Sequence, residues 1–542
     1  MPDELPPHAA PASAAEPVVT DRMSDFEALM WQLEKSPLLA NTMANVTILD
    51  RPPDRRRFQA TMRSAVQKVP RLHSRAVPAP GRLANPMWVD DPEFDLDHHL
   101  RWVNLGGHGT RDDLYEFVAT ITRQPFDRER PLWDFVIVEG LEGGRAAMVQ
   151  RMHHTITDGE GGIRLSVAFL DLERTPEDTR NGRGDATTND PGNARPTEAG
   201  SGDHTADGAT ADGATADGAT ADEATGDGVA ADEATTDGAT GREAPGEPTM
   251  LGEAARALGH TVRTRSGQLV GAIGSAGNMA RHPTDAAEFA RSAARQVVMP
   301  NRCSPLWTQR SLQRWYGTTT LDLARVKEAA HALGGSVNDF FVAGAAAGAA
   351  AYHVRHGAPV EHLRVSMPIS VRHGANKREP ADGAAKADAM AGGNAFSPAQ
   401  TLLPTSPIDP AAQFRAVHDT LGTAKAERAL GVVDGAAPVL NLLPTAALVA
   451  TGERATASVD FVVSNVRAAP FDLYIAGALM EANYPVGPLA GTAFNITTMS
   501  YRGQLFIGLH VDPVAVEDPA GLLADIDAAY DALFAAAGDG RR

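Results

Sequence analysis

A run of five-residue repeats in the middle of the chain restricts the possible folds more than any other stretch. From Asp207 to Asp237 an aspartate recurs every five residues within copies of Ala-Thr-Ala-Asp-Gly. Large apolar side chains are almost absent between residues 176 and 249, so burial cannot offset the loss of chain entropy. A pentapeptide solenoid is the structured alternative, but it needs an inward apolar residue and the repeat offers only alanine. We therefore expect a disordered linker at 176–249 that separates two folded domains.

The same stretch accounts for most of the net charge of −19. Between Pro176 and Glu247 there are 17 acidic and four basic residues, a balance of −13, which leaves −6 for the rest of the chain. A folded part with so little charge has no basic footprint of the kind that nucleic-acid binding requires, and no nucleic-acid motif is present. We expect no nucleic-acid partner.

The two ends of the chain are predicted to be disordered. Residues 1–22 contain five prolines and no basic residue before Arg22, so they lack both the charged start and the apolar core of a secretory signal. Residues 537–542 form a short polar tail. The single cysteine, Cys303, cannot form an internal disulfide, which favours a cytoplasmic location.

Helix-start signals and alternating runs predict two mixed α/β domains, at 23–175 and 250–536. In the first domain, Ser24 followed three residues later by Glu27 forms a capping box, and Asp54 caps a second helix that Pro70 ends. A third helix is expected at 112–122, and apolar runs between the helices read as strands.

The second domain repeats this organisation. A strand is expected at 318–323, a helix that Ser336 and Asp339 cap, a hairpin that turns at 501–503, and a closing helix from about 519 to 536. Gly344 and Gly348 lie four residues apart on the alanine-rich helix, which predicts close approach of a neighbouring backbone.

The longest uncharged run, residues 435–452, is near the lower length limit for a membrane span. Pro438, Asn441 and Pro444 make it a poor spanning helix. We expect a buried or interfacial segment that can contact a bilayer surface.

Residues 145–162, RAAMVQRMHHTITDGEGG, carry the candidate reaction centre. An apolar run that suits a buried strand leads to His153 and His154, and helical spacing begins after Gly162. Histidine can take and return a proton near pH 7, so one of the pair can act as a general base. Asp158, near the helix start, can hold the loop through hydrogen bonds.

The histidines of this chain allow two other interpretations. His98 and His99 form a second pair, but charged neighbours and the absence of a following Asp-Gly favour a surface location. A metal site at His153, His154 and Asp158 is the alternative at the motif. No cysteine and no HExxH pattern accompanies them, so we expect no metal.

The HHxxxDG spacing resembles the signature of the chloramphenicol-acetyltransferase-like acyltransferases. Further stretches are similar to those of the wax ester synthase/diacylglycerol acyltransferase family. In the family's order these are PLW at 131–133, HHTITDG at 153–159, SVND at 336–339, PISVR at 368–372, GGN at 392–394, SNV at 464–466 and the run at 473–505. The resemblance covers roughly residues 23–175 and 250–535. It departs at Arg467, where the family usually has proline, and at 305–316.

The resemblance implies two similar α/β domains with an active-site tunnel at their junction. It also implies transfer of a long-chain acyl group from acyl-CoA to a lipid hydroxyl, that of a diacylglycerol or a fatty alcohol. His154 is then the base, with His153 beside it in a less certain role. Acyl-CoA is a substrate, and no cofactor is expected. Lipid substrates imply peripheral attachment to the inner face of the cell membrane or to lipid droplets.

Further site residues are expected around this centre. Asn338 and Asn495 are candidate donors to the oxyanion, and Trp133 is either a substrate contact or part of the core. Asp158 is expected to pair with an arginine, for which Arg372 is the candidate, and Gly159 to allow a backbone angle or a close approach.

Two rival functions remain. An acyltransferase of the same fold can act on carrier-protein-bound intermediates, although the late DFGWG-like stretch of that group is absent. A non-catalytic lipid-binding relative is the second, and the intact HHxxxDG motif argues against it.

Overall fold

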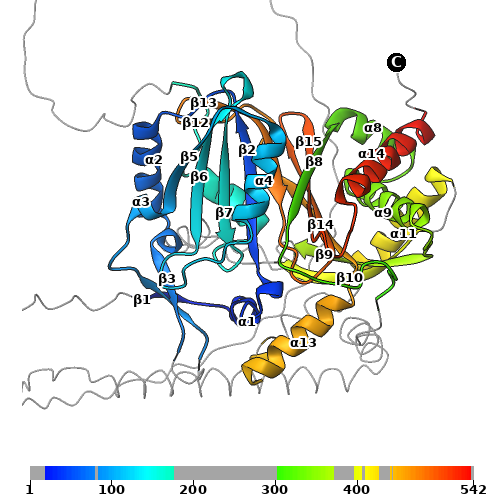
Figure 1. The fold of residues 1–542 in the computed structure, drawn as a ribbon, viewed down its shortest axis with the longest axis horizontal. Coiled ribbons are helices and arrows are strands. Elements are labelled where there is room, and N and C mark those ends of the chain that lie inside the picture. The colour runs from blue at the N-terminus through cyan, green and yellow to red at the C-terminus, as the bar shows by residue number, and fades with distance from the viewer. Residues whose placement is uncertain are drawn as a thin grey trace, which may run out of the picture. The chain divides into compact units, whose positions relative to one another are not determined.

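Two six-stranded sheets carry the fold in the computed structural model of the chain (Figure 1). The structure describes residues 19–79, 84–175, 302–370, 396–405, 409–426, 437, 440–441 and 443–538. All of them belong to one compact unit. The predicted class, a mixed α/β fold with two lobes, is confirmed.

The first sheet has the order β12-β13-β2-β7-β6-β5, antiparallel except for the β5–β6 pair. Its strands are β12 (Tyr474–Ile475), β13 (Ala478–Val486), β2 (Thr42–Leu49), β7 (Ala146–His153), β6 (Trp133–Leu141) and β5 (Leu100–Gly109). The helices of this lobe are α1 (Asp25–Leu33), α2 (Arg55–Lys68), α3 (Leu96–His99), α4 (Arg111–Ile121) and α5 (Gly159–Ser166). Short 3-10 turns occur at Pro37–Leu39, Pro70–Leu72 and Glu142–Gly144.

The second sheet has the order β10-β9-β11-β14-β15-β8. Its strands are β10 (Phe396–Pro404), β9 (His362–Ser370), β11 (Phe461–Arg467), β14 (Phe494–Tyr501), β15 (Gln504–Val511) and β8 (Trp315–Asp322). Its helices are α8 (Leu323–Ala332), α9 (Val337–Arg355), α11 (Pro410–Ala426), α13 (Thr445–Ala457) and α14 (Pro519–Ala536). Figure 1 shows α9, α11 and α14 on the side of this sheet that faces away from the first.

Among the described residues, one segment that follows β11 belongs to the sheet of the first lobe. After β11 the chain enters the first sheet as β12 and β13, where β13 pairs with β2, and it then returns as β14. This differs from the predicted C-terminal domain at 250–536, because residues 474–486 lie in the sheet of the first lobe. The crossing is tight: a Cβ built on Gly508 of β15 would lie 1.9 Å from the Pro485 carbonyl oxygen of β13.

Local predictions about helix starts and helix packing are confirmed. Ser24 with Glu27 and Ser336 with Asp339 form reciprocal capping boxes. On α9, a Cβ on Gly348 would lie 2.5 Å from the Cα of Ile526 of α14, so glycine permits the close approach.

The predicted disorder at the start of the chain is wrong for its last four residues. Val19–Arg22 form β1, which pairs with β4 (Met87–Asp90), and β4 in turn pairs with β3 (Ser74–Val77). The expectations for 1–18, for the linker at 176–249 and for 539–542 fall outside the described residues.

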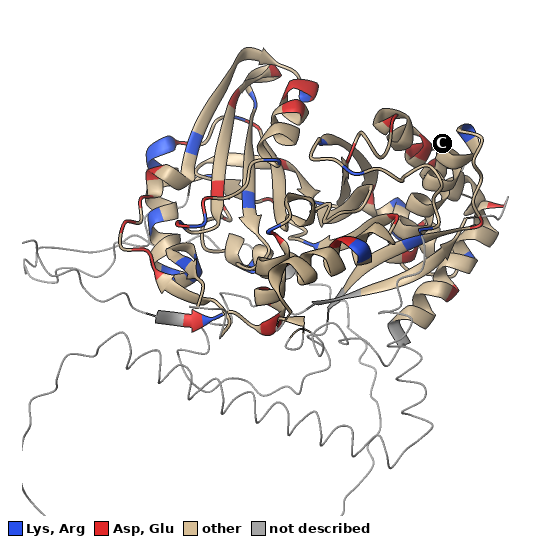
Figure 2. Ribbon diagram, turned by 60° about the horizontal axis from the view of Figure 1, so that its bottom comes forward, with Lys and Arg blue, Asp and Glu red and all other residues tan. Residues whose placement is uncertain are grey.

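The structure also bears on the distribution of charge and on whether any helix could span a membrane. Acidic and basic residues are interspersed along the described ribbon of both lobes (Figure 2). Part of the uncharged run at 435–452 lies in α13, and within the described ranges no helix combines the length and the apolar composition that crossing a membrane needs.

Candidate active site

A cavity of about 550 Å³ lies between the two sheets. One side of its wall comes from α1, β2, β7 and the start of α5, and the other from β9, β11, β14 and α13. Most of the lining is apolar, and of the described residues in the wall only His154 and Asp158 are titratable. A second hollow of about 590 Å³, over α9, α11 and α14, has no histidine, cysteine or aspartate among its described lining.

Strand alternation decides which histidine faces the cavity. Side chains on a strand alternate between the two faces of the sheet, and Gln150, Met152 and His154 all line the cavity. His153 is only 1% exposed and does not line it. The imidazole available to a substrate is therefore that of His154.

Both ring nitrogens of His153 are engaged by protein groups. Its Nε2 lies 2.5 Å from Oε2 of Glu34, and its Nδ1 lies 2.7 Å from Oγ1 of Thr155. The backbone N–H of Thr155 also donates to Nδ1, at 3.1 Å, so Nδ1 is an acceptor and Nε2 carries the proton that faces Glu34. Among the described residues, no cluster of His, Cys, Asp and Glu suits a metal ion.

Glu34 connects the two histidines. Its carboxylate lies 3.1 Å from Arg128 and accepts the backbone N–H of Asn41 at 3.4 Å, and the carbonyl of Asn41 accepts the N–H of His154 at 3.0 Å. Burial opposes ionisation of Glu34, but its pKa is lowered overall because His153 and Arg128 favour the carboxylate. Glu34 thus holds the backbone on which His154 is mounted.

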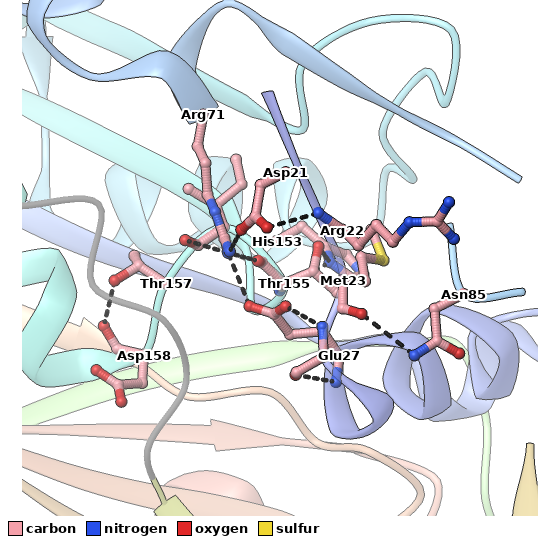
Figure 3. A network of polar contacts seen from close by, with 12 residues as sticks. Asp21, Arg22, Met23, Glu27, Arg71, Asn85, His153, Thr155, Thr157 and Asp158 are labelled. Carbon is pink, nitrogen blue, oxygen red and sulfur yellow. Dashed lines mark hydrogen bonds and ion pairs between the residues drawn. The ribbon is translucent and has the colours of Figure 1, made fainter. Parts of the chain in front are cut away.

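A buried arginine holds the loop after the histidines (Figure 3). Nη1 of Arg71 donates to Glu27 of α1 at 2.7 Å and to the Thr155 carbonyl at 2.9 Å. Asp21 of β1 lies 3.3 Å from Nη2 of Arg71. Nothing local in the sequence marks Arg71 or Glu34, because both act through contacts far apart along the chain.

Asp158 caps the helix that follows the loop. Its side chain is buried and accepts the N–H of Gly161 at 2.8 Å at the start of α5. The predicted partner Arg372 lies outside the described residues. Gly159 allows a close approach to β11, since a Cβ there would lie 3.1 Å from Cγ2 of Val466.

The candidate substrate contacts are placed differently from one another. Asn495 lines the cavity, but its Oδ1 accepts from Thr497 at 2.7 Å and its Nδ2 donates to the Pro488 carbonyl at 2.9 Å. Asn338 does not line the cavity, and its Oδ1 accepts from Asn465 at 3.2 Å.

Trp133 belongs to the core, where its Nε1 donates to the Leu72 carbonyl at 2.8 Å. The surface prediction for the second histidine pair is wrong for His99, which is buried between Trp133 and Phe94. Burial lowers the pKa of His99 to about 4. The charged neighbours favoured exposure of both histidines, but the short helix α3 directs His99 into the core. His98 is exposed as predicted.

Comparison with known proteins places this geometry in a family. The wax ester synthase/diacylglycerol acyltransferase catalytic domain matches residues 23–211 and 206–341, and the C-terminal domain of the same family matches 392–534. The chain belongs to this family. It is an acyltransferase, and the resemblance found in the sequence is confirmed.

Two proteins of Mycobacterium tuberculosis strain H37Rv, both provisionally named diacylglycerol O-acyltransferase, resemble this acyltransferase over nearly their whole lengths. One is 29% identical over 97% of this chain and 94% of its own, and the other is 26% identical over 95% and 97%.

Two solved structures share the fold. The wax ester synthase/diacylglycerol acyltransferase from Marinobacter aquaeolei VT8 aligns with a TM-score of 0.58 at 18% identity, over 95% of this chain and 100% of that one. A mutant starter condensation domain of rhizomide synthetase in complex with C8-CoA and Leu-SNAC aligns with a TM-score of 0.52 at 14% identity, over 96% and 95%.

Proposed function

We propose that this acyltransferase moves a long-chain acyl group from acyl-CoA to the hydroxyl of a lipid, with His154 as general base. The observation that carries the proposal is the position of His154, the one imidazole in the described wall of a largely apolar cavity. The names of the relatives and of the family support a diacylglycerol or a fatty alcohol as acceptor.

The chemistry needs one group that takes a proton and then returns it. His154 removes the proton of the acceptor hydroxyl as its oxygen attacks the thioester carbonyl. The tetrahedral intermediate collapses, the carbon–sulfur bond breaks, and the imidazolium protonates the departing CoA thiolate. No acyl-enzyme is required. General-base action of this kind contributes roughly 10² to 10⁴ in rate.

The lining of the cavity favours long aliphatic chains. Phe26, Leu29 and Leu33 of α1 face it from one lobe, and Leu448 of α13 faces it from the other. Each methylene that leaves water contributes roughly 0.8 kcal/mol, so the chain supplies more binding energy than any single polar contact. Because such substrates collect in lipid, we place the enzyme at the cytoplasmic surface of the membrane or of lipid droplets.

The rival reaction would act on carrier-protein-bound intermediates, and the condensation domain shares the fold of this chain. The match to both domains of the wax ester synthase/diacylglycerol acyltransferase family favours a lipid acceptor.

The test is release of free thiol from palmitoyl-CoA with hexadecanol or a diacylglycerol as acceptor. We expect the wild type to be active with at least one of them, and His154→Ala to be about 10² to 10⁴ times slower. His98→Ala, at the exposed histidine, is the matched control. An inactive wild type with both acceptors, or a fully active His154→Ala, would overturn the proposal.

A further inference from the structure

Two amide side chains face the cavity from adjacent strands of the first sheet. Asn45 of β2 and Gln150 of β7 are direct partners in the antiparallel ladder, so their side chains point to the same face. Both line the cavity. On its other side Gln150 pairs with Phe135 of β6, which is fully buried. The amide pair therefore stands at the boundary between the aromatic core and the cavity.

The hydrogen-bonding capacity of this pair is largely unused. Gln150 is 7% exposed, and its amide makes one contact with a described side chain, a 3.9 Å approach of Nε2 to the weakly accepting sulfur of Met152. Asn45 is half-buried, and its amide makes no hydrogen bond to a described residue. Each amide offers two donors and an acceptor, and leaving such groups unmatched in an apolar setting is unfavourable.

The opposite wall behaves differently. Asn495 of β14 also lines the cavity, but Thr497 and the Pro488 carbonyl occupy its amide oxygen and nitrogen. An amide that only stabilises the fold is expected to have both its oxygen and its nitrogen hydrogen-bonded within the protein, as Asn495 does. The unmatched pair on β2 and β7 is instead arranged for a polar group that enters the cavity.

The strand sets the separation between this pair and the reaction centre. Gln150 precedes His154 by four residues, and an extended strand advances about 3.3 Å per residue, which gives about 13 Å. That is the length of roughly ten bonds of an extended chain. A group bound by the pair therefore belongs to the same substrate molecule that reacts at His154.

We propose that Asn45 and Gln150 form a polar subsite for a hydrogen-bonding group carried on the substrate chain roughly ten bonds from the reacting carbonyl or hydroxyl. The inference rests on the proposed acyl transfer at His154. The chemistry that fits is an amide or a hydroxyl, because paired carboxamides can donate and accept at once. Two sources carry it: the second amide of the pantetheine arm of acyl-CoA, and an oxygen substituent on the aliphatic chain.

The test uses variants that keep side-chain volume and remove hydrogen bonding, Gln150→Met and Asn45→Leu. Gln59→Met, which removes an amide of α2 outside the described cavity wall, is the matched control. Four donors are compared with one acceptor, hexadecanol. Palmitoyl-CoA is compared with the palmitoyl thioester of N-acetylcysteamine, which lacks the second amide, and 12-hydroxystearoyl-CoA is compared with stearoyl-CoA.

We expect Gln150→Met and Asn45→Leu to lower kcat/KM roughly 5- to 100-fold for the donor that carries the recognised group. A loss with palmitoyl-CoA but not with the N-acetylcysteamine thioester assigns the subsite to the pantetheine arm. A loss confined to the hydroxylated donor assigns it to the chain. Variants as active as Gln59→Met on every donor would overturn the subsite and show that the two amides contact only water.

Failure of the subsite and failure of the proposed function give different results. An active wild type with unaffected variants overturns the subsite alone. If the wild type releases no thiol with any donor, calorimetric binding of the same donors to the wild type and to Gln150→Met decides the subsite by itself. Equal affinities would then overturn it, and thermal unfolding establishes that each variant is folded.

Discussion

At the scale of single residues, the two histidines of the motif have separate tasks. His154 continues the cavity-facing side of β7, whereas His153 lies behind it between Glu34 and Thr155. The sequence predicted a base in this pair, and the structure adds the reason for assigning that role to His154. One step along a strand reverses the direction of a side chain.

Substitution of each histidine is expected to give a different defect. His154→Ala should keep its melting temperature within a few degrees and lose turnover, because the ring lines a cavity. His153→Ala should lower the free energy of unfolding by about 1–3 kcal/mol, because the half-buried Glu34 carboxylate loses one of its donors and the buried Thr155 N–H loses its acceptor. Thermal unfolding together with thiol release checks this. Equal loss of stability in both variants would contradict it.

Glu34 should make stability depend on pH in the acid range. Its pKa is lower in the folded chain than its ordinary value of 4.5. A lowered carboxyl pKa stabilises the fold above the ordinary pKa, and this contribution is lost as the pH falls through the folded value. Glu34→Gln should therefore be less stable than the wild type at pH 7, and the difference should shrink below about pH 4.5.

Urea unfolding at a series of pH values measures this difference. Glu129→Gln is the control, because Glu129 is highly exposed and pairs with Arg75 at the surface. A difference between Glu34→Gln and the wild type that stays constant down to the lowest pH would contradict the linkage.

At the scale of elements, α1 is the support of the reaction centre. Glu27 and Glu34 lie at its two ends. Glu27 contacts Arg71, which holds the loop (Figure 3), and Glu34 contacts His153 directly. The helix therefore holds the motif on both sides of His154, although it precedes the motif by about 120 residues.

Removal of the buried cation should be severe, and removal of the whole pair should be milder. Arg71→Met removes the cation that lies 2.7 Å from the buried Glu27 carboxylate, and loss of this ion pair costs roughly 3–5 kcal/mol of unfolding free energy. The double variant Arg71→Met with Glu27→Leu should recover part of that loss, because no charge is then buried alone. Arg75→Met is the surface control, and chemical denaturation is the measurement. A double variant less stable than Arg71→Met would contradict this account.

Sequence patterns predicted the helices and strands better than they predicted which distant residues and strands contact one another. The capping boxes at Ser24 and Ser336 and the hairpin of β14 and β15 depend on residues a few positions apart, so local chemistry determines them. Arg71, Glu34 and the β2–β13 pair depend on chain closure over tens to hundreds of residues. His99 was misplaced for the same reason, because its burial comes from Trp133, a strand away.

At the scale of the whole molecule, strand exchange joins the lobes independently of the linker. Cleavage between residues 186 and 246 removes one covalent connection but leaves β13 paired with β2. We expect the two fragments to elute together in gel filtration and to keep thiol-release activity within about twofold. A single engineered protease site allows the cleavage, and an uncut sample is the control. Separate elution of the fragments would contradict the expectation.

β13 also determines whether the amino-terminal half can remain soluble when it is produced alone. A polypeptide that stops before residue 250 would lack β13, and β2 would become a bare edge with unpaired backbone groups. Such an edge recruits further strands from like molecules, so an isolated amino-terminal half should form insoluble assemblies during expression. The loop that carries His154 therefore has a stable support only when the last third of the gene is translated as well.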